Sequence, residues 1–113
     1  MFRTEDKSLK VAEKNIICYK RVNTHKAGYV TSFLISFPYK FGKLYTENNW
    51  ESTKNDVISA GVAIFGFHSY KKNEPVRKSI KQTVRCIIPK GSEYYENKSE
   101  YISNSIIVKS VIK

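Results

Sequence analysis

His68 is the residue of this chain best suited to chemistry. It lies in the stretch IFGFHSYKK, two residues after Gly66 and two before Tyr70. On a strand these three residues share a face, and the missing side chain of Gly66 leaves room for a pocket beside the imidazole. An imidazole in such a pocket can serve as a general acid or base. The competing interpretation, which we favour, is that His68 packs at the end of a strand and bonds to a carbonyl.

Other reactive side chains lack the spacing that metal binding or nucleophilic catalysis requires. The second histidine, His25, lies in a predicted turn far along the chain from His68, and no carboxylate pair has ligand spacing. No nucleophile-elbow motif is present. Cys18 and Cys86 fall in apolar, strand-like runs, which predicts two buried thiols and no disulfide framework. We therefore expect no metal, no cofactor and a function that leans away from catalysis.

A cluster of cations directly follows Tyr70. Seven basic residues lie within twenty positions that hold one acid, Glu74: Lys71, Lys72, Arg77, Lys78, Lys81, Arg85 and Lys90. Asn73 and Pro75 carry helix-start signals, so the stretch predicts a short helix on which Arg77 and Lys81 share a face.

Aromatic residues near this cluster offer stacking surfaces for unpaired bases. We expect one binding patch made of Lys71, Lys72, Arg77, Lys78, Lys81, Arg85, Tyr19 and Phe67. The competing interpretation is a solvated basic face that keeps the protein dissolved. A second charged stretch, 92–101, places three glutamates among three tyrosines. This stretch is typical of a hairpin. Head-to-tail self-association, in which it contacts the basic patch of a second copy, remains an alternative.

The net charge of +10 and the pI near 9.6 favour an acidic partner, whether protein, nucleic acid or anionic lipid. Of the 20 basic residues, 16 are lysine, which lacks the planar fork that reads guanine. Sequence-specific DNA recognition is thus disfavoured, whereas nonspecific binding of RNA or single-stranded DNA stays open. An AT-rich genome would produce the same lysine bias.

The pattern of apolar residues predicts a β-dominated α+β fold in one domain. Strands are expected over 15–22, 29–37 and 83–89, and the polar stretch 48–56 is expected to be a loop. In total we expect about six strands in a curved antiparallel or mixed sheet, with one or two short helices. Residues 1–14 are expected to form a polar, solvated arm or a short first-turn helix ahead of the domain at 15–113. Gly61 predicts a turn or bulge, and Gly66 predicts a close backbone approach.

No apolar run approaches the length of a membrane span, and the charged N-terminal stretch does not fit a signal peptide. We expect a cytoplasmic protein with no membrane partner.

Four motifs in order give the chain a resemblance to small uncharacterised proteins of bacteriophages and mobile elements. These motifs are ICYKRV, FPYKFGKLYTE, GFHSYKKNE and the closing IPKGSEYYEN with EYISNSIIV. The long link NNWESTKNDVISAGVAIF departs from the usual spacing of the two middle motifs. The resemblance implies a phage-type accessory protein in the host cytoplasm, and it carries no established activity.

A weaker resemblance is to the ADP-ribosyltransferase-type fold, in which residues on separate strands of a split sheet grip NAD. It implies catalytic candidates at His68 or Arg21, at Tyr70 and at Glu100 or Glu93. The carboxylate would stabilise a developing oxocarbenium ion while the polar groups orient the ribose. No cluster of small hydroxyl residues occupies the place of that family's middle motif.

The preferred hypothesis from the sequence is a protein that occupies a host macromolecule, as a host-takeover or anti-defence inhibitor of an acidic host protein. Three alternatives stay open. They are a nonspecific RNA or single-stranded DNA binder, an ADP-ribosyltransferase-like nucleotide-binding protein centred on His68, and a small virion component.

Overall fold

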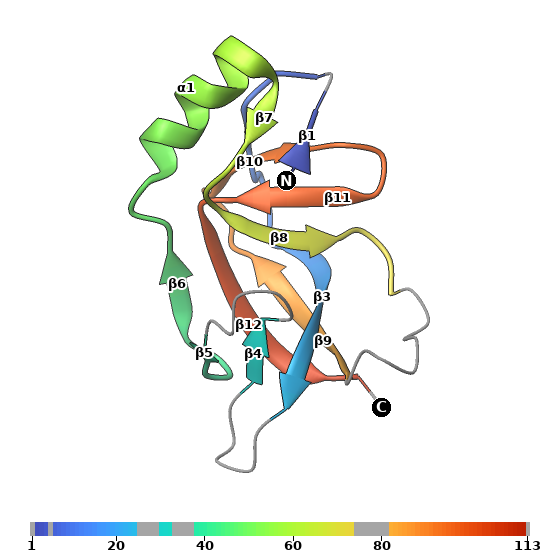
Figure 1. Cartoon of the computed structure of the whole chain (residues 1–113). Helices are drawn as coiled ribbons and strands as arrows, with labels where there is room; N and C mark the ends of the chain where they lie inside the picture. The colour runs from blue at the N-terminus through green and yellow to red at the C-terminus, as the bar shows by residue number, and fades with distance from the viewer. Residues whose placement is uncertain (1, 5, 25–29, 33–37, 74–81, 113) are drawn as a thin grey trace.

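The three longest strands lie side by side in one sheet (Figure 1). They are β3 (Ile16–Thr24), β9 (Gln82–Ile88) and β12 (Ser105–Val111), with β9 between the other two. The coordinates are a computed structural model, which describes five stretches of the chain: 2–4, 6–24, 30–32, 38–73 and 82–112.

Eight antiparallel strands follow one another across the main sheet. In spatial order they are β2 (Lys10–Val11), β10 (Glu93–Glu96), β11 (Glu100–Ser103), β8 (Phe67–Tyr70), β3, β9, β12 and β6 (Leu44–Thr46). Two more strands branch from β3: β4 (Val30–Ser32) pairs with β3, and β5 (Pro38–Tyr39) pairs with β4. No pairing among the described residues joins β2 to β6, so the curved sheet remains open.

The fold class predicted from the sequence is confirmed in outline. The chain forms one β-rich domain, and its radius of gyration of 13.6 Å is that of a single domain of this length. The strand count exceeds the six expected, because short segments without alternation, such as β2 and β6, are added at the sheet edges. The helix predicted after Asn73 falls on residues 74–81, which lie outside the described part of the chain.

The helix α1 (Trp50–Ala60) forms where we expected a loop, over 48–56, and it continues to the glycine expected to form a turn or bulge. Its buried residues are Trp50, Thr53 and Val57, whose spacing of three and four places them on one face. Gly61 ends the helix in the left-handed conformation (φ 68°) and donates its N–H to Val57 O at 2.9 Å. Gly61 is therefore a helix cap. No helix in the described ranges is long and apolar enough to cross a membrane.

The N-terminal residues also differ from the solvated arm expected over 1–14. Phe2 is 1% exposed, and its strand β1 (Phe2–Arg3) pairs with β7 (Val62–Ala63) in a separate two-stranded sheet. Thr4 N then donates to Gly61 O at 3.1 Å, and β2 extends the main sheet beside β10. The buried side chains of Phe2 and Ala12 attach this segment to the domain. The sequence did not indicate this, because charged residues dominate the segment.

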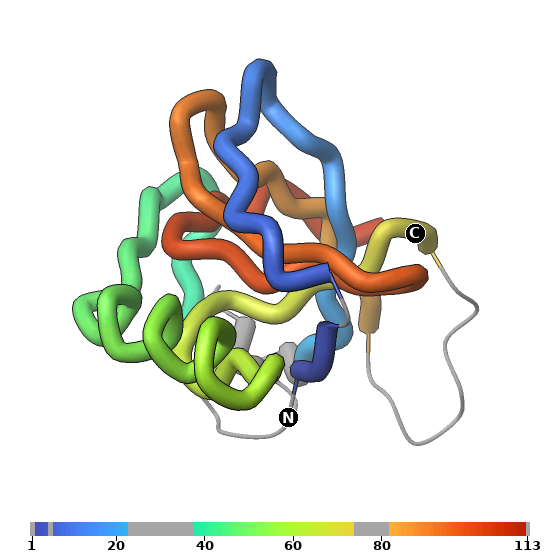
Figure 2. The backbone as a smooth tube through the Cα atoms, turned by 90° about the horizontal axis from the view of Figure 1, so that it is seen from above, coloured from blue at the N-terminus to red at the C-terminus, as the bar shows by residue number. Residues whose placement is uncertain are grey.

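The sheet has an apolar core on each of its faces. The larger core lies inside the curve and includes Cys18 and Phe67. The smaller core lies on the opposite face, where α1, β1 and β7 cover β10 and β11 (Figures 1 and 2). Strand β11 serves both, since Tyr101 packs against the larger core and Ile102 belongs to the smaller one.

Gly66 makes the close backbone approach predicted from the sequence. Its φ is +142°, and a Cβ atom there would lie 2.7 Å from Ile102 Cγ1 and 3.0 Å from Trp50 Cζ3. Only glycine fits, because both the backbone conformation and the packing of the smaller core exclude a side chain.

The buried amine of Lys20 occupies the place where the sheet divides. β3 pairs with β8 only at Tyr19 and Tyr70 and then turns to β4 at Val22. The His68 carbonyl, two residues before Tyr70, lies beyond this single pair of β3 and β8. Lys20 Nζ donates to this carbonyl and lies 5.6 Å from the centre of the Tyr39 ring.

Burial lowers the pKa of Lys20, whose side chain is enclosed by the larger core. No carboxylate in the described part of the chain pairs with it. The neighbouring thiols supply no negative charge at neutral pH, because burial raises the pKa of Cys18 to about 11 and that of Cys86 further. Among the described residues, the printed contacts of the Lys20 amine are thus the His68 carbonyl and the Tyr39 ring.

We predict that Gly66→Ala destabilises the protein by about 3 kcal/mol, through backbone strain and overpacking against Ile102. Gly91→Ala is the matched control, because Gly91 has φ +88° but open space around its Cα. It should cost about 1 kcal/mol from backbone strain alone. Urea unfolding at neutral pH measures both values, and equal losses in the two variants would contradict the close approach.

We predict that Lys20 makes stability rise with pH. Its pKa is lower in the folded state than the 10.5 of an exposed lysine, so the unfolded chain binds more protons between the two values. Within that window the wild type gains up to about 1.4 kcal/mol per pH unit relative to Lys20→Met. Urea unfolding from pH 7 to 10.5 compares the two proteins, with the exposed Lys109→Met as control. Parallel curves for wild type and Lys20→Met would show that folding does not lower the pKa of Lys20.

Candidate functional site

An in-register row of aliphatic side chains crosses the face of β3, β9, β12 and β6 that points away from the larger core. Directly opposite residues of paired strands share a face. Ile17 is opposite Ile87, Ile87 is opposite Ile107, and Ile107 is opposite Leu44. We call these four residues the apolar row. At about 4.8 Å per strand the row spans roughly 14 Å.

The apolar row is open to solvent. Ile17 is 57% exposed and Leu44 is 51% exposed, while Ile87 and Ile107 are half-buried. None of the four belongs to either core. Contiguous apolar surface of this kind is uncommon on soluble domains except at sites of interaction.

A second row, parallel to the first and about 7 Å from it along the strands, carries aromatic and charged side chains. Glu100, Tyr70, Tyr19 and Arg85 are in register across β11, β8, β3 and β9. The Arg21 guanidinium joins them, 4.9 Å from the centre of the Tyr70 ring. These five residues form what we call the Tyr–Arg row. Arg85 is exposed and the other four are half-buried.

The two rows together form a basic face. The sequences of β3, β9, β12 and β6 contain no Asp or Glu, whereas Arg21 and Arg85 both project from this face. Glu100 lies at the far end of the Tyr–Arg row, on β11. The charge of the face therefore complements an acidic surface.

His68 lies on the same face as Tyr70, beside the N-terminal strand β1, and its side chain is exposed. It is opposite Ile102, and its ring centre is 6.0 Å from that of Phe2. Part of the imidazole reaches solvent, yet crowding by protein atoms and the nearby Lys20 ammonium lower its pKa to about 4. The lowered pKa favours the neutral imidazole over the imidazolium at pH 7. The described residues contain no group of three or more His, Cys, Asp and Glu that could hold a metal ion.

The basic patch predicted from the sequence is divided by the fold. Tyr19 and Arg85 lie on the outward face, whereas Lys71 pairs with Glu96 and lies 5.2 Å above the Tyr101 ring. Phe67 is 6% exposed in the larger core, so it offers no stacking surface. Lys72 is exposed just beyond β8. The remaining members, Arg77, Lys78 and Lys81, lie outside the described residues.

The candidates carried by the ADP-ribosyltransferase-type resemblance are partly brought together. Arg21, Tyr70 and Glu100 meet within the Tyr–Arg row, with His68 one position along β8 on that face. Glu93 lies on β10, apart from the Tyr–Arg row, and stabilises the fold. It accepts a hydrogen bond from Trp50 Nε1 at 3.0 Å and an ion pair from Lys54 at 3.5 Å.

Sequence reasoning missed the apolar row, although a signal was present. Isoleucine pairs occur in the runs NIIC, CIIP and SIIV of β3, β9 and β12. In an alternating strand, two adjacent isoleucines place one on each face. Their repetition in three strands that pair with one another indicates a sheet with apolar side chains on both sides.

Comparison with known proteins adds no further constraint on this site. No protein-family model, no curated protein and no solved structure matches the chain.

Proposed function

We propose that this protein acts by binding another protein through the outward face of β3, β9, β12 and β6. The apolar row forms the centre of the interface, and the Tyr–Arg row forms its basic flank. The observation that carries the proposal is the in-register exposure of four aliphatic side chains beside Arg21 and Arg85. The partner is an acidic protein, and the resemblance to small bacteriophage proteins supports a partner in the cytoplasm of a bacterial host.

The composition of the face favours a protein over a nucleic acid. Protein interfaces place apolar side chains at the centre and are enriched in tyrosine and arginine. A nucleic acid would gain from Tyr19 and Arg85, but the aliphatic row offers neither stacking rings nor donors to phosphate. Two copies of this chain docked face to face would bring their arginines together. The same charges would speed association with an acidic partner.

We predict that Ile17→Glu combined with Leu44→Glu abolishes partner binding. Both side chains are more than half exposed, so the substitutions leave the cores intact. Burial of two carboxylates without partners at the centre of the interface should weaken binding at least about 100-fold. The measurement is a tagged pull-down from bacterial lysate with nuclease treatment, followed by the affinity for the purified partner.

The matched control is Ile58→Glu combined with Ile64→Glu, which changes two exposed isoleucines outside the face. It carries the same change in charge and should retain the partner. Equal loss in both double variants would contradict the assignment of the face. Recovery of heterogeneous material that disappears with nuclease would favour the nucleic-acid alternative.

A second candidate function rests on the meeting of Arg21, Tyr70 and Glu100. These residues match three candidates of the ADP-ribosyltransferase-type resemblance, and they share one face across three strands. We predict that, if this function holds, millimolar NAD or ADP-ribose raises the melting temperature, because a ligand selective for the folded state stabilises it. Glu100→Gln should reduce the shift, and the exposed Glu13→Gln should not. No shift with either ligand would discard this function.

A further inference from the structure

Strand β6 lies at one edge of the main sheet, and no pairing among the described residues uses its outer side (Figure 1). On its inner side, Glu47 N donates to Asn104 O at 2.8 Å. In an antiparallel pair, every second residue directs its N–H and C=O toward the neighbouring strand. Tyr45 therefore directs these groups toward β12, whereas Leu44 and Thr46 direct theirs toward the outer edge.

This edge is flanked by two charges of opposite sign, Lys43 just before β6 and Glu47 just after it. Neither side chain forms an ion pair with another described residue. Lys43 is exposed, and its Nζ lies 5.3 Å from the centre of the Tyr45 ring. Unpaired backbone groups at a sheet edge can bind a further strand. The edge of β6 thus attracts a strand that carries the same two charges in reverse order.

An antiparallel copy of β6 has this order of charges. We propose that two copies of this chain pair through β6 about a two-fold axis at Tyr45. Leu44 of each copy then lies opposite Thr46 of the other, and the two residues exchange both backbone hydrogen bonds. Lys43 of each copy lies opposite Glu47 of the other, where opposite charges attract. A register centred on Leu44 or on Thr46 would not bring the two charges together.

Edge-to-edge pairing also keeps the arginines of the two basic faces apart. In the paired sheet, the two copies of β9 are separated by five strand spacings, or about 24 Å. This distance exceeds the Debye length of roughly 8–10 Å at physiological ionic strength. The dimer therefore avoids the repulsion that face-to-face docking would cause.

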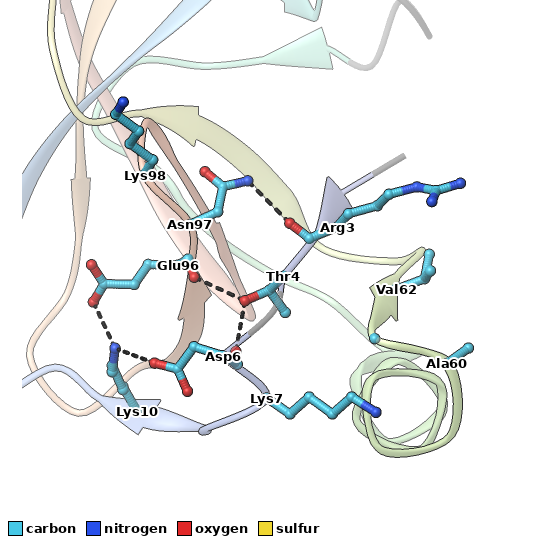
Figure 3. A pocket seen from close by; sticks show the side chains of 11 residues that line it. Arg3, Thr4, Asp6, Lys7, Lys10, Ala60, Val62, Glu96, Asn97 and Lys98 are labelled. Atoms are coloured by element: carbon cyan, nitrogen blue, oxygen red, sulfur yellow. Dashed lines mark hydrogen bonds and ion pairs between the residues drawn. The ribbon is translucent and has the colours of Figure 1, made fainter.

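The opposite end of the sheet differs from β6. Strand β2 is two residues long, and its Lys10 already pairs with Asp6 and Glu96, each at 3.2 Å (Figure 3). Glu96 also accepts a hydrogen bond from Lys71. These charges are satisfied within one chain, which makes β6 the edge that suits a second copy.

The proposed dimer would change the outward surface. A two-fold axis perpendicular to the sheet leaves the outward faces of both copies on the same side. Leu44 of one copy and Leu44 of the other become diagonal neighbours, about 7–8 Å apart. The two apolar rows, of four side chains each, then form one surface across both copies. The dimer itself does not depend on the acidic partner.

The test is sedimentation equilibrium of the purified chain from about 1 µM to about 500 µM, a range that covers weak interfaces. We expect a monomer–dimer equilibrium for the wild type. Lys43→Glu and Glu47→Lys each place like charges opposite each other in both ion pairs, so each should raise the dissociation constant about tenfold. The combined variant restores opposite charges and should restore the wild-type constant. The melting temperature of each variant verifies that it is folded.

The change in net charge separates the edge contact from general repulsion. Lys43→Glu lowers the net charge by two, from +10 to +8, which by itself favours association of basic molecules. The control, Lys14→Glu, makes the same change at an exposed position outside the edge and should not weaken the dimer.

The proposal is overturned if the wild type stays monomeric over the whole range. It is also overturned if the single variants dimerise like the wild type, or if the combined variant does not recover, since the copies would then meet elsewhere. Partner binding is read separately by the pull-down, so retention of the partner without a dimer would leave the proposed function in place.

Discussion

The contact between the Lys20 ammonium and the His68 carbonyl holds the sheet together where it divides. β3 offers one edge to two different strands, β8 and β4, and the His68 carbonyl at the division accepts a hydrogen bond from Lys20 Nζ. A buried carbonyl without a partner costs about 1–3 kcal/mol. The lysine side chain satisfies it, although burial of its charge is itself unfavourable. The contact lies close to both cores, because β8 carries Phe67 into the larger core and pairs with β11, which carries Ile102 into the smaller one.

The position of the helix decides which surface remains for binding. An eleven-residue helix is about 16 Å long, whereas eight strands at their usual spacing extend over roughly 34 Å. One helix with β1 and β7 therefore covers only part of the outward surface. The end of the sheet at β10 and β11 receives this cover and becomes a second core. The end at β3, β9, β12 and β6 keeps the apolar row at the surface, beside the positive charges of Arg21 and Arg85.

The sequence predicted those features that depend on neighbouring residues. Apolar, β-branched and aromatic residues located most of β3, and alternation located most of β9. The apolar setting of Gly66 indicated a close backbone approach, which the structure places at Ile102. The sequence did not locate α1, because only Trp50, Thr53 and Val57 carry the helical spacing and one of them is a threonine. The composition of the site depends on which residues of neighbouring strands lie opposite each other. Alternation within one strand does not determine this register. Tyr19 and Arg85 were selected as binding residues, but nothing in the sequence placed them opposite each other or turned Phe67 inward.

Lys20 is the buried lysine of the described part of the chain. Its chemical modification can therefore be used to detect local opening of the sheet around it. Reagents that acylate amines reach exposed lysines at once, but they reach this one only when β3 and β8 separate. The rate at which Lys20 is labelled therefore measures how often the sheet opens at the division between β8 and β4. An acylated amine is uncharged and larger than the space it left. Each labelled molecule is thus trapped with its larger core disrupted.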